Sequence, residues 1–173
     1  QHGFISAKKN ETPRNLMAFK DGTVNPRKNN DLKKYVFIDN GWAENGTYCI
    51  IRRIQIHIET WDRTALEEQE ATFGRKRSTG APLTGKKEFD NIDLNAKNNK
   101  GKYVIDENAH TRLAREVKTS IKRRAYNYND GTNAKTGDLD TGLMFICFQK
   151  SIQQFIDIQN NLGHNDKSVS YTH

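Results

Sequence analysis

The feature that most constrains the fold is Tyr48–Glu59, where the sequence YCIIRRIQIHIE alternates apolar and polar residues. Its second half places isoleucines on one face and polar side chains on the other: Ile54, Ile56 and Ile58 against Gln55, His57 and Glu59. A period of two is typical of a β-strand with one buried face. We therefore expect a half-buried strand here.

A short helix should follow this strand. Thr64-Ala-Leu-Glu67 matches a capping box, in which the first and fourth side chains satisfy backbone groups at the start of a helix. Leu66 and Phe73 then share a helical face, and Gly74 ends the run.

Two more strands and a second helix come later. Ile121–Tyr128 and Leu143–Gln149 predict strands joined by a glycine-containing loop, and the second is apolar on both faces, which favours a central position. Ser151–Gln154 repeats the capping-box pattern, and apolar residues follow at helical spacing before Gly163: Ile152, Phe155, Ile156 and Leu162. The order βαββα predicts an α+β, ferredoxin-like fold with an antiparallel sheet, whose final strand the chain does not supply.

Two long segments lack periodicity. Residues 1–45 are expected to form a loop region ahead of a ferredoxin-like domain at 46–173, and residues 75–108 a second long loop inside that domain. The 173 residues suffice for one compact domain. No apolar run approaches the ~18 residues of a membrane span, and no signal peptide is visible. The first residue is Gln1 rather than methionine, which suggests a trimmed or fragmentary chain.

The chain is basic, with 28 Lys and Arg against 21 Asp and Glu and a net charge of +7. This balance favours acidic partners such as nucleic acid, anionic surfaces or anionic small molecules, although a solvated basic surface is the simpler explanation. Cys49 and Cys147 both lie in apolar, strand-like runs, so we interpret them as core residues rather than a disulfide or a metal pair.

Two candidate residues for chemistry also have structural explanations. Asp21, in the sequence FKDGT, is either a turn residue, because Asp-Gly suits tight turns, or a carboxylate held for catalysis. His110 ends a long loop ahead of a strand-like segment, where a neutral imidazole can bind a metal or haem iron, although a lone histidine is a weak signal.

Two basic segments are equally ambiguous. Lys122–Arg124, followed by Tyr126 and Tyr128, is compatible with a sheet that stacks RNA bases or with an edge strand whose basic face is solvated. Arg75–Gly80 offers several donors that suit carboxylates or phosphates, and a solvated loop explains it as well.

Taken in order, five segments resemble the C-terminal, haem-binding half of a dye-decolourising-type haem peroxidase, in the deferrochelatase/peroxidase branch. They span nearly the whole chain: ETPRNLMAFKDGT (residues 11–23), ETWDRTALEEQEATFGRKRSTGAPL (59–83), ENAHTRLA (107–114), RRAYNY (123–128) and LDTGLMFICFQ (139–149). The resemblance implies one half of a barrel-like α+β peroxidase built from two related domains.

The resemblance also implies roles for individual residues. Asp21 matches the distal acid–base residue, Arg123 the distal arginine, and His110 the proximal ligand of the haem iron. Four further residues resemble positions that line the haem, with the last on a propionate: Gly22, Thr23, Val24 and Arg75. Two departures are visible, since Ala18 replaces the first glycine of the family motif and Arg115–Val117 replace a stretch that normally touches haem.

The implied activity is reduction of hydrogen peroxide with oxidation of dyes, phenols or porphyrinogen, with release of iron from haem as a further expectation. An aspartate base implies an acidic optimum, because carboxylates stay ionised at about pH 4–6 where imidazoles, with pKa values near 6.5, are protonated. Trp42 and Trp61 are candidates for oxidation of large dyes at the surface, although packing is the simpler role for both.

The implied cofactor is one haem b per chain. The implied partners are peroxide, a reducing substrate, the N-terminal half of the same protein, a second copy in a homo-oligomer and an iron-uptake permease system, with no nucleic acid, and the family implies export. Two alternatives stay open: a non-catalytic haem-binding or haem-delivery protein, and a basic ferredoxin-like module that binds nucleic acid.

Overall fold

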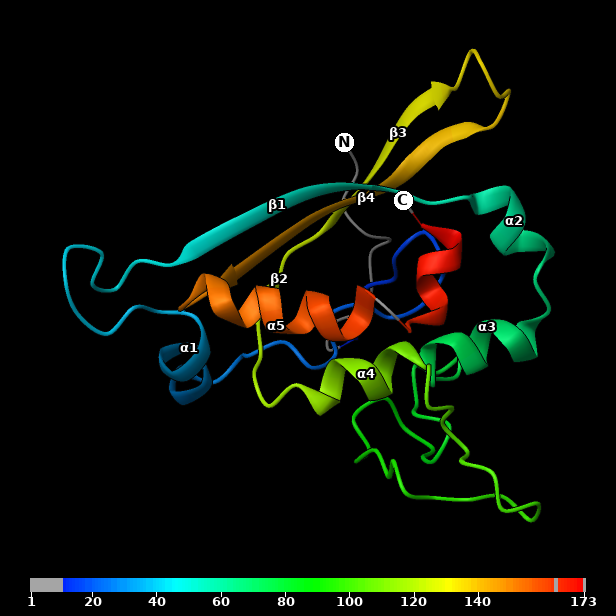
Figure 1. The fold of residues 1–173 in the computed structure, drawn as a ribbon, viewed down its shortest axis with the longest axis horizontal. Helices are drawn as coiled ribbons and strands as arrows, with labels where there is room; N and C mark the ends of the chain where they lie inside the picture. Colours follow the sequence, from blue (N-terminus) through cyan, green and yellow to red (C-terminus); the bar gives the residue numbers. More distant parts are fainter. Residues whose placement is uncertain (1–10, 164, 173) are drawn as a thin grey trace.

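A computed structural model describes residues 11–163 and 165–172 of the chain. The elements in chain order are α1 (Asn29–Tyr35), β1 (Tyr48–Gln55), α2 (Ile58–Arg63), α3 (Leu66–Phe73), α4 (His110–Glu116), β2 (Lys122–Arg123), β3 (Tyr126–Thr132), β4 (Leu139–Gln149), α5 (Ile152–Gly163) and the 3-10 helix η1 (Lys167–Tyr171). Figure 1 shows α4 and α5 on one side of the sheet and the β3–β4 hairpin projecting beyond the rest. The predicted α+β, ferredoxin-like class is confirmed.

Strand β4 is the centre of the sheet, as predicted from its apolar residues. It pairs with β1 along one edge and with β2 and β3 along the other, always antiparallel. Cys147 lies in register with both Ile50 and Arg123. The single strand expected at residues 121–128 is interrupted, because β2 ends at Arg123 and β3 begins at Tyr126.

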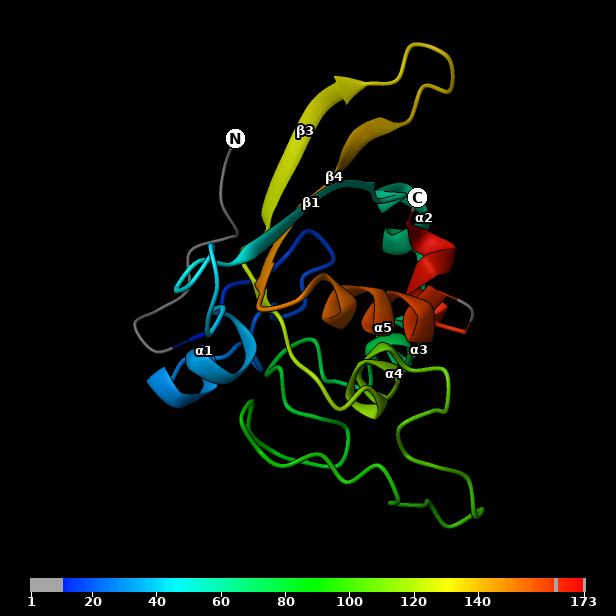
Figure 2. The same ribbon diagram turned by 60° about the vertical axis from the view of Figure 1, so that its left-hand side comes forward.

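One face of the sheet is covered by helices. The ring of Phe145 on β4 lies 6.1 Å from that of Phe155 on α5, measured between centroids, and both views show α5 running beneath the sheet (Figures 1 and 2). Side chains two residues apart on a strand share a face, so Cys147 points the same way as Phe145. Arg123, its register partner, therefore lies on the helix-bearing face.

The main hydrophobic core joins the N-terminal loop to the helices. Its buried members are Met17, Phe19, Ile56 and Trp61. Phe19 stacks on Phe73 with 4.3 Å between ring centroids, and the indole N–H of Trp61 donates to the carbonyl of Met17 at 3.2 Å. Residues 16–19 are thus held against α2 and α3, immediately before Asp21.

Helix starts were predicted with mixed success. The capping box at Ser151–Gln154 is confirmed, since the Ser151 N–H donates to Gln154 Oε1 at 2.9 Å. The one at Thr64 is wrong, because α3 begins after Ala65 without a side-chain cap. The Thr64 hydroxyl instead donates to the Thr60 carbonyl at the end of α2, a helix that the sequence pattern did not reveal.

Three further expectations need correction. Residues 1–45 are not all loop, since α1 lies within them. Cys49 is exposed rather than in the core, because it lies on the sheet face opposite to Cys147. Trp42, 96% exposed, is not a packing residue, since it stands in the turn between α1 and β1.

Other expectations hold within the described residues. Cys147 is fully buried, and burial raises the pKa of its thiol to about 11. Trp61 is a packing residue at 1% exposure. The region between Phe73 and His110 carries no helix or strand, as expected for a long loop. Among the described helices, none has the length and apolar character that a membrane crossing needs.

Candidate functional site

Asp21 lies at the end of a tight loop built by residues 13–20. The Asp21 N–H donates to the Pro13 carbonyl at 3.0 Å, and Arg14 and Lys20 form an isolated antiparallel bridge. Ala18 adopts a φ of +65°, in the left-handed region that favours glycine. The departure from the family motif therefore falls where the backbone requires the conformation for which a glycine is best suited.

The turn places Asp21 against a residue distant in the sequence. Asp21 Oδ1 lies 3.1 Å from Nη2 of Arg123, which reaches it from β2. The Asp21 side chain is 10% exposed and that of Arg123 25% exposed, so the ion pair is shielded from bulk water. The two predicted distal residues are therefore brought into direct contact.

Glu88 anchors the loop on both sides of Asp21, through Lys20 and Thr23. Its carboxylate accepts from Lys20 Nζ at 2.7 Å and from the Thr23 hydroxyl at 3.1 Å, and the Lys20 and Glu88 side chains are 8% and 7% exposed. Burial would raise the pKa of Glu88, but the hydrogen bonds from Lys20, Thr12 and Thr23 outweigh it, and the pKa lies below its ordinary value. Asp21 thus lies between Lys20 and Thr23, two residues whose side chains are both bonded to Glu88.

His110 is the first residue of α4, not a loop residue ahead of a strand. Its Nδ1 lies 2.6 Å from Oδ2 of Asp166, a carboxylate that is 2% exposed and caps η1 by accepting from the Ser168 N–H at 2.8 Å. Burial would raise the pKa of Asp166, yet the hydrogen bond and charge of His110 and the contacts of Ser168 lower it overall. Asp166 is therefore the acceptor that orients the imidazole.

The imidazole of His110 keeps one nitrogen free for another ligand. Phe73 contacts the ring at an angle of 63° with 5.8 Å between centroids. No hydrogen bond is present at Nε2 within the described residues. Since Phe73 also stacks on Phe19, a single ring connects the histidine with the segment just before Asp21.

Arg75 lies in a strongly basic part of the site. Its guanidinium donates to the carbonyls of Gly80 at 2.6 Å and Glu88 at 3.1 Å. Burial, followed by the positive charges of Arg115 and Arg123, lowers its pKa, while the charge of Glu88 opposes this. The charges of two other arginines thus act on Arg75, and a region with several cations suits an anionic ligand.

The remaining predicted residues have different environments. Gly22 is buried with a φ of +102°. Thr23 is half-buried and bonded to Glu88, and Val24 is 54% exposed. Their assignment as haem-lining positions stays a prediction.

The sequence did not reveal several residues that build the site. Asp166, Glu88 and Asn25 all hold a predicted residue through hydrogen bonds. The only local signal was the Asp-Lys-Ser spacing at Asp166, which is typical of a cap and says nothing of a histidine far away in the chain.

This donor set fits haem better than a bare metal ion. Within the described residues no group of three or more His, Cys, Asp and Glu side chains could hold a metal. A single histidine with a carboxylate on its second nitrogen suits an iron whose other ligands come from a porphyrin. The basic group around Arg75 suits the two propionates of that porphyrin.

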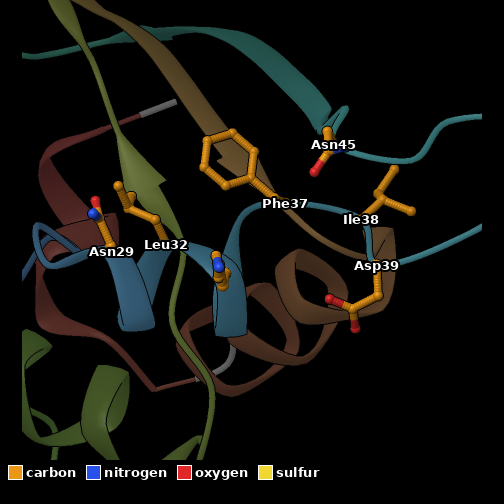
Figure 3. A pocket seen from close by; sticks show the side chains of 7 residues that line it. Asn29, Leu32, Phe37, Ile38, Asp39 and Asn45 are labelled. Carbon is orange, nitrogen blue, oxygen red and sulfur yellow. The ribbon is translucent and has the colours of Figure 1, made fainter.

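A separate pocket lies beside α1 and has a volume of about 380 Å³. Figure 3 shows that α1 and the loop that follows it line this pocket. Its lining residues are Asn29, Leu32, Lys33, Phe37, Ile38, Asp39 and Asn45. None of the predicted site residues is among them.

The chain is similar to known proteins over nearly its whole length. The sequence model described as "Dyp-type peroxidase, C-terminal" matches residues 12–173. Curated relatives named deferrochelatase, from Yersinia pseudotuberculosis and from Escherichia coli K12, are each 41% identical over 181 residues. The matches cover 94% of this chain and 41% and 42% of those relatives, so the chain spans about two-fifths of their length.

Solved structures agree with these sequence relatives. An oxyferrous complex of DtpA from Streptomyces lividans superposes with a TM-score of 0.91 at 32% identity, and a DyP-type peroxidase from Cellulomonas bogoriensis with 0.87 at 36%. Each match covers 97% of this chain and 48% of the other. A dye-decolorizing protein from V. cholerae, at 20% identity and a TM-score of 0.62, shares the fold.

Proposed function

Because the chain belongs to the Dyp-type peroxidase family over residues 12–173, we propose that it is the haem-binding part of a peroxidase that uses hydrogen peroxide to oxidise dyes, phenols or a porphyrinogen. The observation that carries the proposal is the ion pair between Asp21 and Arg123 at 3.1 Å. A carboxylate and a guanidinium held together and shielded from water are the two groups that cleavage of a peroxide bond requires.

His110 and the arginines would hold the haem. The free Nε2 of His110 would bind the iron, and Arg75 and Arg115 would pair with the propionates. When bound, the haem supplies the iron that binds peroxide and accepts its oxidising equivalents. Asp166 fixes the tautomer of His110 by accepting its Nδ1–H and makes the imidazole a better electron donor.

Asp21 would move the proton. Its carboxylate accepts the proton from the inner oxygen of hydrogen peroxide and returns it to the outer oxygen, which then leaves as water.

Arg123 would stabilise the charge that develops on the departing oxygen. Its guanidinium is already positioned by Asp21 and by the sheet, so little reorganisation is needed as the bond breaks.

The two alternatives explain fewer observations. A haem-delivery protein needs His110 and the basic group but has no use for a shielded Asp21–Arg123 pair. A nucleic-acid module needs aromatic residues on an open basic face, yet Tyr128 is 5% exposed beneath Arg53 and Arg123 is paired with Asp21.

The partners are inferred from the exposed sheet face and from the relatives. Apolar side chains remain exposed on the face away from α5, with Ile51 at 64% and Tyr126 at 37%. The longer relatives carry further sequence that can cover such a face. We therefore retain the N-terminal half of the same protein as a partner.

Other expectations rest on resemblance alone. Relatives named deferrochelatase support release of iron from haem as a second activity. Homo-oligomerisation, an iron-uptake permease partner and export stay predictions.

A haemin titration tests the proposal. The wild type should give a stoichiometric Soret band and peroxide-dependent dye oxidation, and His110→Ala should weaken haem binding. Asp21→Asn should retain the Soret band and lose turnover by at least about 100-fold, at the low end of general acid–base contributions. Unchanged turnover in Asp21→Asn would favour haem delivery. Salt-sensitive RNA binding without a Soret band would favour the nucleic-acid module.

A further inference from the structure

The loop that carries Asp21 also holds the backbone of Arg123. The side-chain amide of Asn25 donates from Nδ2 to the Arg123 carbonyl at 2.9 Å. The Arg123 N–H in turn donates to Asn25 Oδ1 at 3.0 Å. Both polar ends of one side chain are thus committed to one residue of β2.

Arg123 lies at an edge of the sheet where no strand neighbour is described. β2 has two residues and pairs only with β4. The next N–H along the chain, that of Arg124, donates to the Ile146 carbonyl of β4 at 2.8 Å. Successive backbone groups on a strand point to opposite edges, so the N–H and C=O of Arg123 point away from β4. The amide of Asn25 takes the place of the missing strand.

A tight turn connects Asn25 to Asp21. The Asn25 N–H donates to the Gly22 carbonyl at 3.1 Å, and Gly22 adopts a φ of +102°. A Cβ atom at Gly22 would lie 2.9 Å from Asn25 Nδ2. Glycine is therefore required both for the backbone conformation and for the space that the amide occupies.

We propose that Asn25 is a positioning residue that sets the spacing of Asp21 and Arg123, an inference that rests on the proposed peroxidase function. One short loop holds the arginine at two points, with Asp21 on its guanidinium and Asn25 on its backbone. Arg123 cannot shift along the edge of the sheet without breaking the two hydrogen bonds between its backbone and the Asn25 side chain. The positions of Asp21 and Arg123 are thereby fixed before peroxide binds. Stabilisation of a developing charge is most effective when the charged groups need not rearrange.

Removing the amide should reduce reactivity toward peroxide and leave the haem in place. We expect Asn25→Ala to lower kcat/KM for peroxide about 10- to 100-fold, since small misplacements at a reacting centre cost this much. The KM for the reducing substrate and the Soret band should stay unchanged. Asn98→Ala is the matched control, because Asn98 also makes two hydrogen bonds to backbone, from the N–H groups of Lys100 and Lys102.

A double-mutant cycle separates positioning from a general structural role. If Asn25 acts through Arg123, adding Asn25→Ala to Arg123→Ala should cost nothing further. Losses that multiply in the double variant would overturn the inference, and so would wild-type kcat/KM in Asn25→Ala while Arg123→Ala loses activity.

Two measurements do not depend on turnover. Fluoride binds ferric haem and accepts hydrogen bonds from a distal donor, so its affinity should fall in Asn25→Ala about as far as in Arg123→Ala. Hydrogen exchange at the Arg123 amide should accelerate in the haem-free Asn25→Ala protein, because the N–H has lost its acceptor. An unchanged exchange rate would overturn the inference even if the protein proves not to be a peroxidase. If Asn25→Ala does not fold, Asn25→Leu, which has a similar size and lacks both the donor and the acceptor, takes its place in the same measurements.

Discussion

Nδ1 of His110 and Oδ2 of Asp166 lie 2.6 Å apart, with the carboxylate buried at 2% exposure. The contact joins the start of α4 to the cap of η1, two short helices that are well separated in the sequence. It gives the imidazole one orientation and one tautomer. The orientation of His110, the proposed proximal ligand, therefore depends on a residue that the sequence around His110 does not indicate.

Replacing this acceptor should impair the haem site without removing the ligand. Asp166→Asn keeps the shape but takes away the negative charge, so haem affinity or peroxide reactivity should fall roughly 10- to 100-fold, as for other partners of metal-bound histidines. Haemin titration and stopped-flow mixing with peroxide measure the two effects. Asp39→Asn, in the surface pair with Lys150, is the control. Equal behaviour of the two variants would contradict the role of Asp166.

The identity of the distal base should set the pH range of the reaction. Carboxylic acids titrate at about pH 4 and imidazoles at about pH 6.5. Wild-type turnover should therefore peak in acid, and Asp21→His should move the acidic limb of the pH–rate profile toward neutrality. The profile of kcat/KM for peroxide is the measurement. A wild-type optimum at or above pH 7 would exclude Asp21 as the base.

Glu88 should make folding stability depend on pH. The folded-state pKa of Glu88 is lowered, so its contribution is complete above the pKa of an unfolded glutamate, about 4.3, and is lost as the pH falls through the lower folded value. At pH 7, Glu88→Gln should lower the free energy of unfolding by about 3 kcal/mol, because Lys20 is left buried without its partner.

In chemical denaturation, the difference between wild type and Glu88→Gln should shrink as the pH falls below about 4.3, the pKa of an unfolded glutamate. Glu68→Gln, on the exposed side of α3, should show a small and constant difference. A gap between wild type and Glu88→Gln that does not change with pH would mean that the carboxylate is not the group that titrates.

Ala18 offers a stabilising substitution. Its φ of +65° carries a penalty of about 1 kcal/mol for a residue with a Cβ, and Ala18→Gly should recover about that much unfolding free energy. Asn45, at a φ of +62°, is the comparison. Asparagine tolerates this region better, so Asn45→Gly should gain less. A destabilised Ala18→Gly would show that the strain is balanced by packing of the Ala18 methyl group.

Local patterns in the sequence determined the class of the fold. The alternation at Tyr48–Glu59 contains strand β1, although the strand ends at Gln55 and Ile58 begins α2, and the apolar run at Leu143–Gln149 lies in β4, the central strand. The capping box at Ser151 marks the start of α5. These signals succeed because side-chain periodicity and caps are properties of a few neighbouring residues. Two boundaries were not predicted correctly. Thr64 ends α2 instead of capping α3, and the strand expected at residues 121–128 is interrupted between Arg123 and Tyr126.

The site depended on the order of short motifs and on contacts that no motif describes. Asp21, His110 and Arg123 were identified from the sequence, and the structure joins Asp21 to Arg123 directly. Asp166, Glu88 and Asn25 emerged only from the fold, because a hydrogen bond between distant segments leaves no periodic trace in the chain. The sequence by itself nominated Asp21, His110 and Arg123 as the candidate groups, because their residue types and order are local properties of the chain, and only the tertiary structure decided which neighbours hold them and at what distances.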